Sequence, residues 1–142
     1  MDIREITPAY SVAPQIDLND FPAIAAAGFK AVICNRPDPE IPPSHHAAEM
    51  QKAAHAAGLV FYNLPLTHHT MTAEVIAQHM AYAEENTPVL AYCASGTRCT
   101  VAWALGSAAK GMDISEILTK SSAAGYALDA LRPSLEVAAA QS

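Results

Sequence analysis

The segment PVLAYCASGTRCT, residues 88–100, joins a short apolar run to a loop of small residues and an arginine. Its first part, Pro88–Tyr92, has the length and apolar character of a central strand in a parallel sheet. Cys93 follows directly, and Arg98 opens a helical stretch that runs to Lys110. A strand, a tight loop and a helix in succession predict one unit of an α/β fold, with the loop at the carboxyl edge of the sheet.

Strand-like and helix-like stretches alternate along the rest of the chain as well. Further strands are expected at residues 10–16, 29–34 and 59–64, and further helices at 21–27, 44–57, 72–85, 114–124 and, briefly, 128–131. The loop Asn35–Ser44 interrupts this alternation, because its closely spaced prolines exclude a regular helix. The pattern predicts a single three-layer α/β/α domain over residues 1–142, with a mainly parallel sheet of four to five strands. We expect residues 134–142 to form a frayed tail.

The composition describes an acidic chain with a large apolar fraction: 142 residues, formal net charge -6 and 51% hydrophobic residues. The lysines and arginines are scattered singly, so no basic stripe favours nucleic acid or an anionic membrane as a partner. No apolar run reaches the ~18–20 residues of a membrane span. The N-terminus also lacks a signal-peptide pattern, so we expect a cytoplasmic protein. Three cysteines without zinc-type spacing predict a functional thiol, and neither a disulfide scaffold, a metal nor a cofactor is expected.

The loop after the apolar strand has the features of an anion-binding cradle. Backbone N–H groups and the N-terminus of the following helix attract an anion, and Arg98 adds a two-pronged donor. The same field favours the thiolate form of Cys93, which is the nucleophilic form. No carboxylate occurs between Glu85 and Asp113, so nothing in this segment repels an anion. The sequence therefore predicts Cys93 as a nucleophile and an anion-binding loop of Ala94, Ser95, Gly96, Thr97, Arg98 and Cys99.

This loop resembles the active-site loop of cysteine-dependent phosphatases and of rhodanese-like sulfurtransferases. Nearly the whole chain resembles the bacterial β-lactamase-hydrolase-like phosphatase-like family. The matching stretches are residues 12–15, 27–33, 35–38, 95–98, 103–105, 124–126 and 131–133. The resemblance implies a phosphatase-like α/β fold and a hydrolase of the protein-tyrosine or dual-specificity type. Such an enzyme acts on a phosphomonoester through a thiophosphate intermediate, here on Cys93.

Two positions depart from the pattern of this family. Ala94 stands where relatives carry an arginine, which removes one positive charge from the cradle. Cys99 stands where they carry a serine or threonine, whose hydroxyl helps the thiolate leave the phosphoenzyme. The four residues between Cys93 and Arg98 make a loop shorter than that of tyrosine phosphatases and similar to that of rhodanese-like enzymes. The alternatives are therefore a rhodanese-like sulfurtransferase or persulfide-handling protein, and a non-catalytic oxyanion-binding module.

A phosphatase also needs a proton donor for the leaving oxygen. No aspartate lies between Asp38 and Asp113, so the loop at residues 65–71 offers His68 and His69, of which His69 is taken as the catalytic residue, and Asp38 in the proline-rich loop is the other candidate. Arg36 and His68 are candidate pocket residues, because they lie on these same two loops. The expected substrate is a phosphorylated or sulfur-containing small molecule or protein, and a small domain of this kind could form a homodimer.

The two remaining cysteines are expected near Cys93. Cys34 ends a neighbouring strand at the same sheet edge, and Cys99 follows Cys93 by six residues. Either thiol could form a reversible disulfide with Cys93 and protect it from over-oxidation. The alternative is that both are buried thiols without a redox role.

Overall fold

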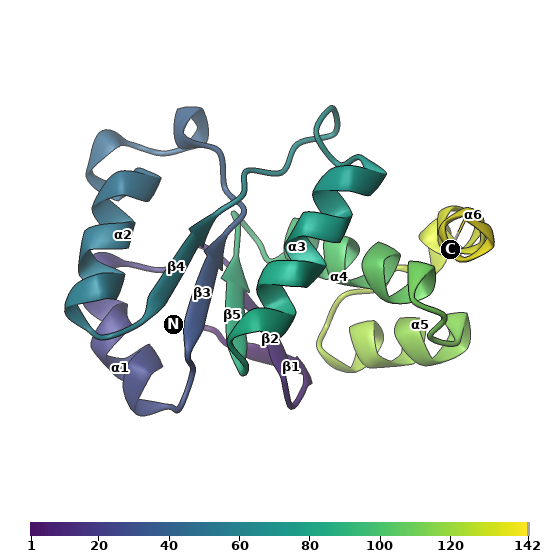
Figure 1. Cartoon of the computed structure of the whole chain (residues 1–142), viewed down its shortest axis with the longest axis horizontal. Helices are drawn as coiled ribbons and strands as arrows, with labels where there is room; N and C mark the ends of the chain where they lie inside the picture. Colours follow the sequence, from purple (N-terminus) through teal and green to yellow (C-terminus); the bar gives the residue numbers. More distant parts are fainter. Residues whose placement is uncertain (142) are drawn as a thin grey trace.

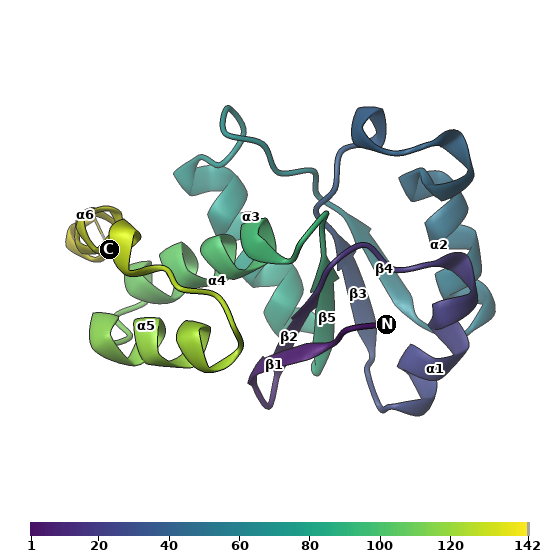
Figure 2. The same ribbon diagram turned by 180° about the vertical axis from the view of Figure 1, so that it is seen from behind.

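A five-stranded sheet runs through the middle of the structure, a computed structural model that describes residues 1–141 (Figure 1). The strands are β1 (Arg4–Thr7), β2 (Tyr10–Ala13), β3 (Ala31–Cys34), β4 (Val60–Asn63) and β5 (Val89–Tyr92). Their order across the sheet is β1-β2-β5-β3-β4. The last four of these strands are parallel, whereas β1 pairs antiparallel with β2 at one edge (Figure 2). The loops that leave β3, β4 and β5 therefore gather at one edge of the sheet.

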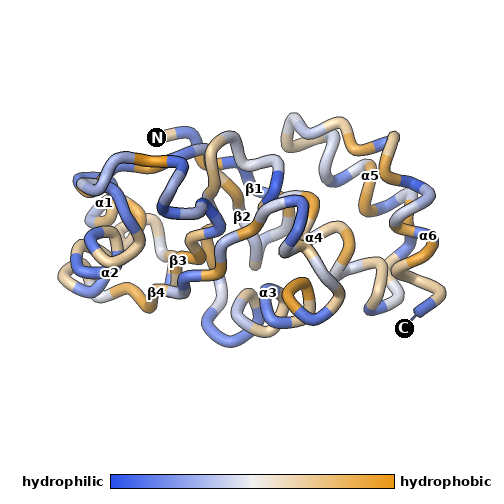
Figure 3. The backbone as a smooth tube through the Cα atoms, turned by 90° about the horizontal axis from the view of Figure 1, so that it is seen from above, coloured by the Kyte–Doolittle hydropathy of each residue, from blue (hydrophilic) through white to orange (hydrophobic). Residues whose placement is uncertain are grey.

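Helices cover both faces of the sheet. They are α1 (Phe21–Ala26), α2 (Ala47–Ala56), α3 (Ala73–Glu85), α4 (Thr97–Ala109), α5 (Ile114–Ala123) and α6 (Arg132–Ala140). Figure 3 shows α1 and α2 on one side of the sheet, α3 and α4 on the other, and α5 and α6 beyond α4. Among residues 1–141, no helix has both the length and the apolar character needed to cross a bilayer.

Alternate residues of β5 face the two helical layers. Leu90 packs in the core that contains Phe21 and Met50, on the side of α1 and α2. Ala91 packs in the core that contains Trp103 of α4. Side chains of a strand alternate between the two faces of a sheet, so one apolar strand fills both cores. The expected three-layer α/β/α architecture with a mainly parallel sheet is confirmed.

The first strand and the proline-rich loop differ in detail from the expectations. The pattern does not reveal β1, because a four-residue edge strand of mixed polarity shows little alternation. The strand expected at residues 10–16 ends at Ala13. Short 3₁₀ turns at Asp38–Glu40 and Pro43–His45 occupy the loop after β3, which is otherwise irregular as expected.

The expectation of a frayed tail at residues 134–142 is wrong as far as Ala140. Residues Arg132–Ala140 form α6, and Leu135 is fully buried. Pro133 resembles a helix stop in the sequence, but here it occupies the first turn, where its missing N–H costs nothing. The last residue of the expected tail, Ser142, lies outside the described residues.

Asn35 fixes the loops at the carboxyl edge relative to one another. It directly follows β3 and is fully buried. Its backbone N–H donates to the carbonyl of Tyr92 at 2.8 Å, and its carbonyl accepts from the Leu66 N–H at 2.9 Å. Its side-chain Nδ2 donates to the carbonyl of Leu64 at 2.8 Å. One residue thus links the ends of β3, β4 and β5, where the candidate site lies.

Candidate active site

The loop between β5 and α4 turns sharply at Gly96. This residue has φ 92°, in the left-handed region that favours glycine, and it directly precedes Thr97 at the start of α4. A side chain at this position would also collide with the hydroxyl of Tyr126. The turn brings the Gly96 N–H to 3.1 Å from the sulfur of Cys93. Glycine is therefore required both for the backbone angle and for the packing of the loop.

The carbonyl oxygens of the loop are held by donors from its surroundings. The pairs are the Gln15 N–H with the Ala94 carbonyl (3.2 Å), the Tyr126 hydroxyl with the Ser95 carbonyl (3.0 Å) and the Thr100 hydroxyl with the Gly96 carbonyl (2.8 Å). Each of these bonds satisfies a carbonyl oxygen of the loop. The loop therefore turns its carbonyls toward other donors, while N–H groups at its end donate to Cys93.

Cys93 is fully buried and held as a thiolate. The thiol of Cys99 donates a hydrogen bond to its sulfur, and backbone N–H groups of Cys99, Gly96 and Arg98 donate as well. The Cys99 thiol is the largest cause that lowers the pKa of Cys93 from 9.0 to about 5, whereas burial acts in the opposite direction. At neutral pH the sulfur is therefore in the form that attacks an electrophile.

Three hydrogen bonds fix the guanidinium of Arg98. Nη1 donates to Glu40 Oε2 and to the Leu66 carbonyl, both at 2.9 Å, and Nη2 donates to Glu40 Oε1 at 2.7 Å. A guanidinium has about five N–H donors, so within the described chain Nε–H and the second Nη2–H stay available. These two donors lie side by side on one edge of the planar group. That edge has the geometry that grips two oxygens of a phosphate or a related anion.

Glu40 is a site residue that the sequence pattern does not single out. Its paired bonds with Arg98 lower the pKa of the Glu40 carboxyl, so it stays ionised and orients the arginine. Arg36 lies beside it: this side chain donates to the Glu40 carbonyl at 2.8 Å and to Gln15 Oε1 at 3.2 Å. The sequence offers one signal for Glu40: it is an acidic residue in the proline-rich loop, and that loop is expected at the same sheet edge as Arg98.

The expected proton donors occupy different places. The Asp38 carboxylate accepts a hydrogen bond from the Ala47 N–H at 2.8 Å, at the start of α2, and lies 3.9 Å from His46. His68 and His69 are both exposed in the loop before α3. His68 lines the cavity beside Arg98, whereas His69 is not part of the lining. The structure therefore groups His68 with Arg98, holds Asp38 against α2 and leaves His69 outside the cavity.

The cavity beside Arg98 has a volume of about 590 Å³. Glu40, Thr97 and His68 supply polar groups to its lining. Its other side chains are mainly apolar, namely Met71, Val101, Leu105 and Leu131. A cavity of this size and character suits the organic part of a molecule whose anionic group is held by the loop.

A chain of buried polar groups lies behind the loop. The Tyr10 hydroxyl donates to the Cys99 carbonyl at 2.7 Å and lies 2.8 Å from His79 Nε2. The hydroxyl hydrogen is used on Cys99, so His79 donates from Nε2, and its Nδ1 accepts from Asn35 Nδ2 at 3.3 Å. Burial lowers the pKa of His79 to about 4, so the ring is neutral as this arrangement requires. His79 lies within the helix expected at residues 72–85, and through Tyr10 it supports the first turn of α4.

The other thiols differ in their relation to Cys93. Cys99 is fully buried beside the thiolate, and burial followed by its bond to Cys93 raises its own pKa well above 9.0. Cys34 is also buried, and its thiol donates to the Arg36 carbonyl at 3.5 Å. All three cysteines are free. Of the two thiols proposed as partners of Cys93, the structure brings Cys99 into contact with it.

Over residues 1–141, no group of three or more His, Cys, Asp or Glu side chains is arranged to hold a metal ion.

The family model for the phosphatase-like domain of beta-lactamase hydrolase-like protein matches residues 2–110. The chain belongs to this family, as the sequence motifs suggest. The beta-lactamase hydrolase-like protein of Agrobacterium fabrum is 36% identical over 112 residues, which are 78% of this chain and 26% of that protein. The chain thus spans about a quarter of the length of the curated relatives that it matches.

Solved structures with a similar fold include two candidate phosphatases. That of Neisseria meningitidis has a TM-score of 0.85 and 33% sequence identity, and the match covers 97% of this chain and 99% of the other. That of Shewanella putrefaciens has a TM-score of 0.72 and 19% identity, with coverage of 99% and 92%. At the lower identity the likeness concerns the fold alone. The family and the fold together are those of a phosphatase-like domain.

Proposed function

We propose that this member of the phosphatase-like family of beta-lactamase hydrolase-like proteins is a cysteine-dependent phosphatase that hydrolyses a phosphomonoester. One observation carries the proposal: the Cys93 thiolate is held by loop amides while Arg98 keeps one edge of its guanidinium available. A nucleophile and an oxyanion clamp in one short loop are the two parts that phosphoryl transfer needs.

In the first step the sulfur of Cys93 attacks phosphorus. The S–P bond forms as the ester P–O bond breaks, and the leaving oxygen takes a proton from a general acid. The free edge of Arg98 and the loop N–H groups bind the equatorial oxygens, whose negative charge is spread among them in the transition state. Glu40 already orients the guanidinium of Arg98, so little reorganisation of this side chain accompanies the reaction.

The placement of the side chains favours His68 as the proton donor. His68 lines the cavity in which the leaving group would lie, next to Arg98. The Asp38 carboxylate is engaged with the N-terminus of α2, and His69 is not part of the cavity lining. Glu40 has a lowered pKa and a paired arginine, so it holds no proton to give at neutral pH.

In the second step water attacks phosphorus, the S–P bond breaks and Cys93 leaves as a thiolate with inorganic phosphate as the product. The thiol of Cys99 donates to that sulfur and stabilises it as it leaves. The neighbouring hydroxyl of Thr100 does not substitute for it, because it donates to the Gly96 carbonyl at 2.8 Å. A thiol is a weaker donor than a hydroxyl, so we expect this step to limit turnover.

The test is hydrolysis of p-nitrophenyl phosphate by the purified chain and by two matched cysteine variants. Cys93→Ser should abolish the activity, and Cys34→Ser, which removes a buried thiol outside the loop, should retain it. Acid quench of the wild-type reaction should trap phosphate on Cys93, detected by mass spectrometry. Full activity of Cys93→Ser would refute the proposed nucleophile.

The second candidate is sulfur transfer, which the four-residue spacing between Cys93 and Arg98 favours, because a short loop encloses a small centre. The thiolate would attack the outer sulfur of thiosulfate, forming a persulfide on Cys93 and releasing sulfite. Cyanide would then take that sulfur as thiocyanate. Transfer from thiosulfate to cyanide without phosphate hydrolysis would make this the function. Binding of oxyanions without either activity would indicate a non-catalytic module.

A further inference from the structure

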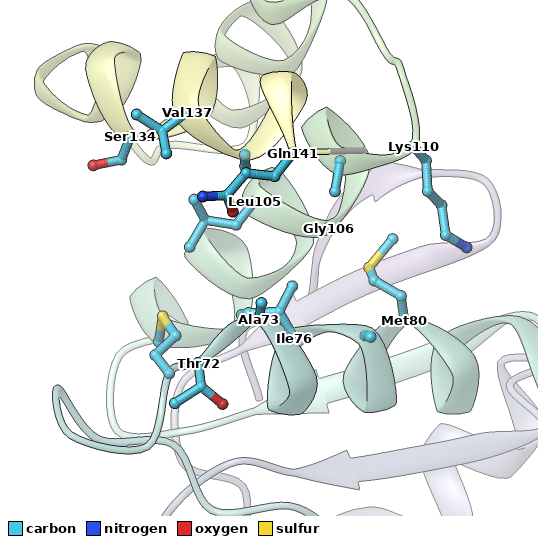
Figure 4. Close-up of a pocket in the computed structure, with 14 residues that line it drawn as sticks. Thr72, Ala73, Ile76, Met80, Leu105, Gly106, Lys110, Ser134, Val137 and Gln141 are labelled. Atoms are coloured by element: carbon cyan, nitrogen blue, oxygen red, sulfur yellow. The ribbon is translucent and has the colours of Figure 1, made fainter.

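A trough runs along α4 between α3 and α6. Its cavity volume is about 460 Å³. Leu105 and Gly106 of α4 form the floor, Ile76 of α3 forms one wall and Val137 of α6 forms the other (Figure 4). Val137 is 56% exposed, so this wall of the trough faces solvent. The trough is therefore an apolar surface open to solvent.

This trough adjoins the cavity beside Arg98. Met71, Leu105 and Ser134 line both spaces, so the two cavities meet at these side chains. The second cavity ends at Thr97 and Arg98. The stretch of α4 from Arg98 to Ala109 covers about 16 Å at ~1.5 Å per residue. An apolar path of that length leads away from the anion-binding loop.

Ionisable side chains are confined to the ends of this path. Arg98, its partner Glu40 and His68 lie at the loop end, and Lys110 lies at the far end beside Glu84. Every other lining residue is uncharged, within the part of the chain that the structure describes. A ligand with several phosphates would need several cations close to the loop. The path instead matches one anionic group attached to an extended apolar chain.

We propose that the substrate is an amphiphilic phosphomonoester, with its phosphate in the loop and an alkyl chain in the trough. This inference rests on the proposed phosphatase function and names its substrate class. With a C–C bond of about 1.5 Å, each methylene adds roughly 1.3 Å, so the path accommodates a chain of about a dozen carbons.

The test compares n-butyl, n-octyl and n-dodecyl phosphate at concentrations below micelle formation. A fully buried methylene improves binding about fourfold. The trough is open on one side, so we expect kcat/KM to rise about twofold per methylene. Val137→Asp places a charge in the trough and should remove this dependence, while hydrolysis of p-nitrophenyl phosphate stays unchanged. Val60→Asp, at an exposed valine on β4, is the matched control and should keep the dependence.

Failure of the inference and failure of the phosphatase function give different results. Equal kcat/KM for all three alkyl phosphates, with p-nitrophenyl phosphate hydrolysed, would overturn the inference alone. A protein that hydrolyses no phosphate but binds dodecyl phosphate more tightly than butyl phosphate by calorimetry would refute the catalytic function and keep the site. If there is no chain-length dependence and Val137→Asp dissociates a dimer in size-exclusion chromatography, the trough is a contact between copies and the inference is wrong.

Discussion

The thiol of Cys99 donates a hydrogen bond to the sulfur of Cys93, six residues earlier in the chain. Both residues are fully buried, so water does not compete for this bond. The contact stabilises the thiolate form of Cys93. In the proposed mechanism the same thiol also stabilises the sulfur as it leaves phosphorus, so we expect Cys99 to affect both the nucleophile and its release.

Replacing Cys99 should therefore change the breakdown of the phosphoenzyme. A serine hydroxyl is a stronger donor than a thiol, so Cys99→Ser should stabilise the leaving thiolate more. We expect kcat to rise by roughly 3- to 10-fold, which corresponds to the net contribution of about one hydrogen bond. Cys99→Ala should lower kcat and raise the pKa of Cys93. Pre-steady-state kinetics with p-nitrophenyl phosphate measures this directly, since slow breakdown gives a burst of p-nitrophenol. Equal burst amplitudes in all three proteins would exclude a role for Cys99 in release.

The thiolate of Cys93 predicts a particular dependence on pH. Its pKa is about 5 in the folded protein against 9.0 for an ordinary thiol. Between these values the unfolded chain carries a proton that the folded chain lacks, so the stability contributed by this group rises with pH from 5 to 9. Below pH 5 that contribution is lost. The rate kcat/KM should likewise rise with pH through about 5, as the nucleophile ionises.

Thiolate absorbance in the ultraviolet, titrated from pH 4 to 8, checks the ionisation of Cys93. The difference between wild-type protein and Cys93→Ser should show one midpoint near 5. Urea denaturation of the same pair at several pH values checks the linkage, because the variant should lack the gain in stability toward high pH. A midpoint near that of a free thiol would contradict the predicted ionisation.

Arg98 should not tolerate replacement by lysine. A lysine keeps the charge but loses the two parallel donors and the bonds to Glu40 and Leu66. We expect Arg98→Lys to lower kcat/KM by about 100- to 1,000-fold, the loss typical of removing a preorganised oxyanion donor. Steady-state kinetics and circular dichroism, which shows that the fold is kept, are the measurements. A loss below about tenfold would mean that charge alone suffices.

The neighbouring histidines form a matched pair for the proton donor. His68→Ala should lower kcat/KM for an alkyl phosphate by roughly 100-fold, within the usual range for general acid catalysis. The same variant should change p-nitrophenyl phosphate hydrolysis little, because p-nitrophenolate leaves without a proton. His69→Ala lies outside the cavity and should leave both rates unchanged. Equal effects of the two variants would remove His68 from this role.

The loop from Cys93 to Arg98 could be identified as a candidate anion-binding site from the sequence because its parts are adjacent in the chain. The spacing from Cys93 to Arg98, with Gly96 between them, determines the local geometry on its own. Glu40 could not be predicted in the same way, because it lies 58 residues from Arg98 and meets it only through the sheet topology. Asp38, a candidate proton donor in the same loop, is engaged with α2.

Helix α6 illustrates a different limit of prediction from the sequence. Pro133 occurs both after helices and in their first turn, and the local sequence does not separate these uses. In the structure the buried side chain of Leu135 shows that a helix continues after Pro133. This burial depends on tertiary contacts, which the local sequence does not reveal. The buried role of His79 was hidden for the same reason, since its partners Tyr10 and Asn35 are 69 and 44 residues away.

The hydroxyl of Tyr10 should contribute to stability through this buried chain. Tyr10→Phe leaves the Nε2–H of His79 without an acceptor and the Cys99 carbonyl without its extra donor. An unsatisfied buried donor costs about 1–3 kcal/mol, so the free energy of unfolding should fall by that amount in urea denaturation. Tyr62→Phe is the matched control, because its hydroxyl accepts one bond, from Asn86, in a partly buried site. The control should lose less stability than Tyr10→Phe. Only Tyr10→Phe should also lower kcat, because the Cys99 carbonyl belongs to the first turn of α4, next to the loop. Equal losses of stability and of kcat in the two variants would show that the buried polar groups do not support the site.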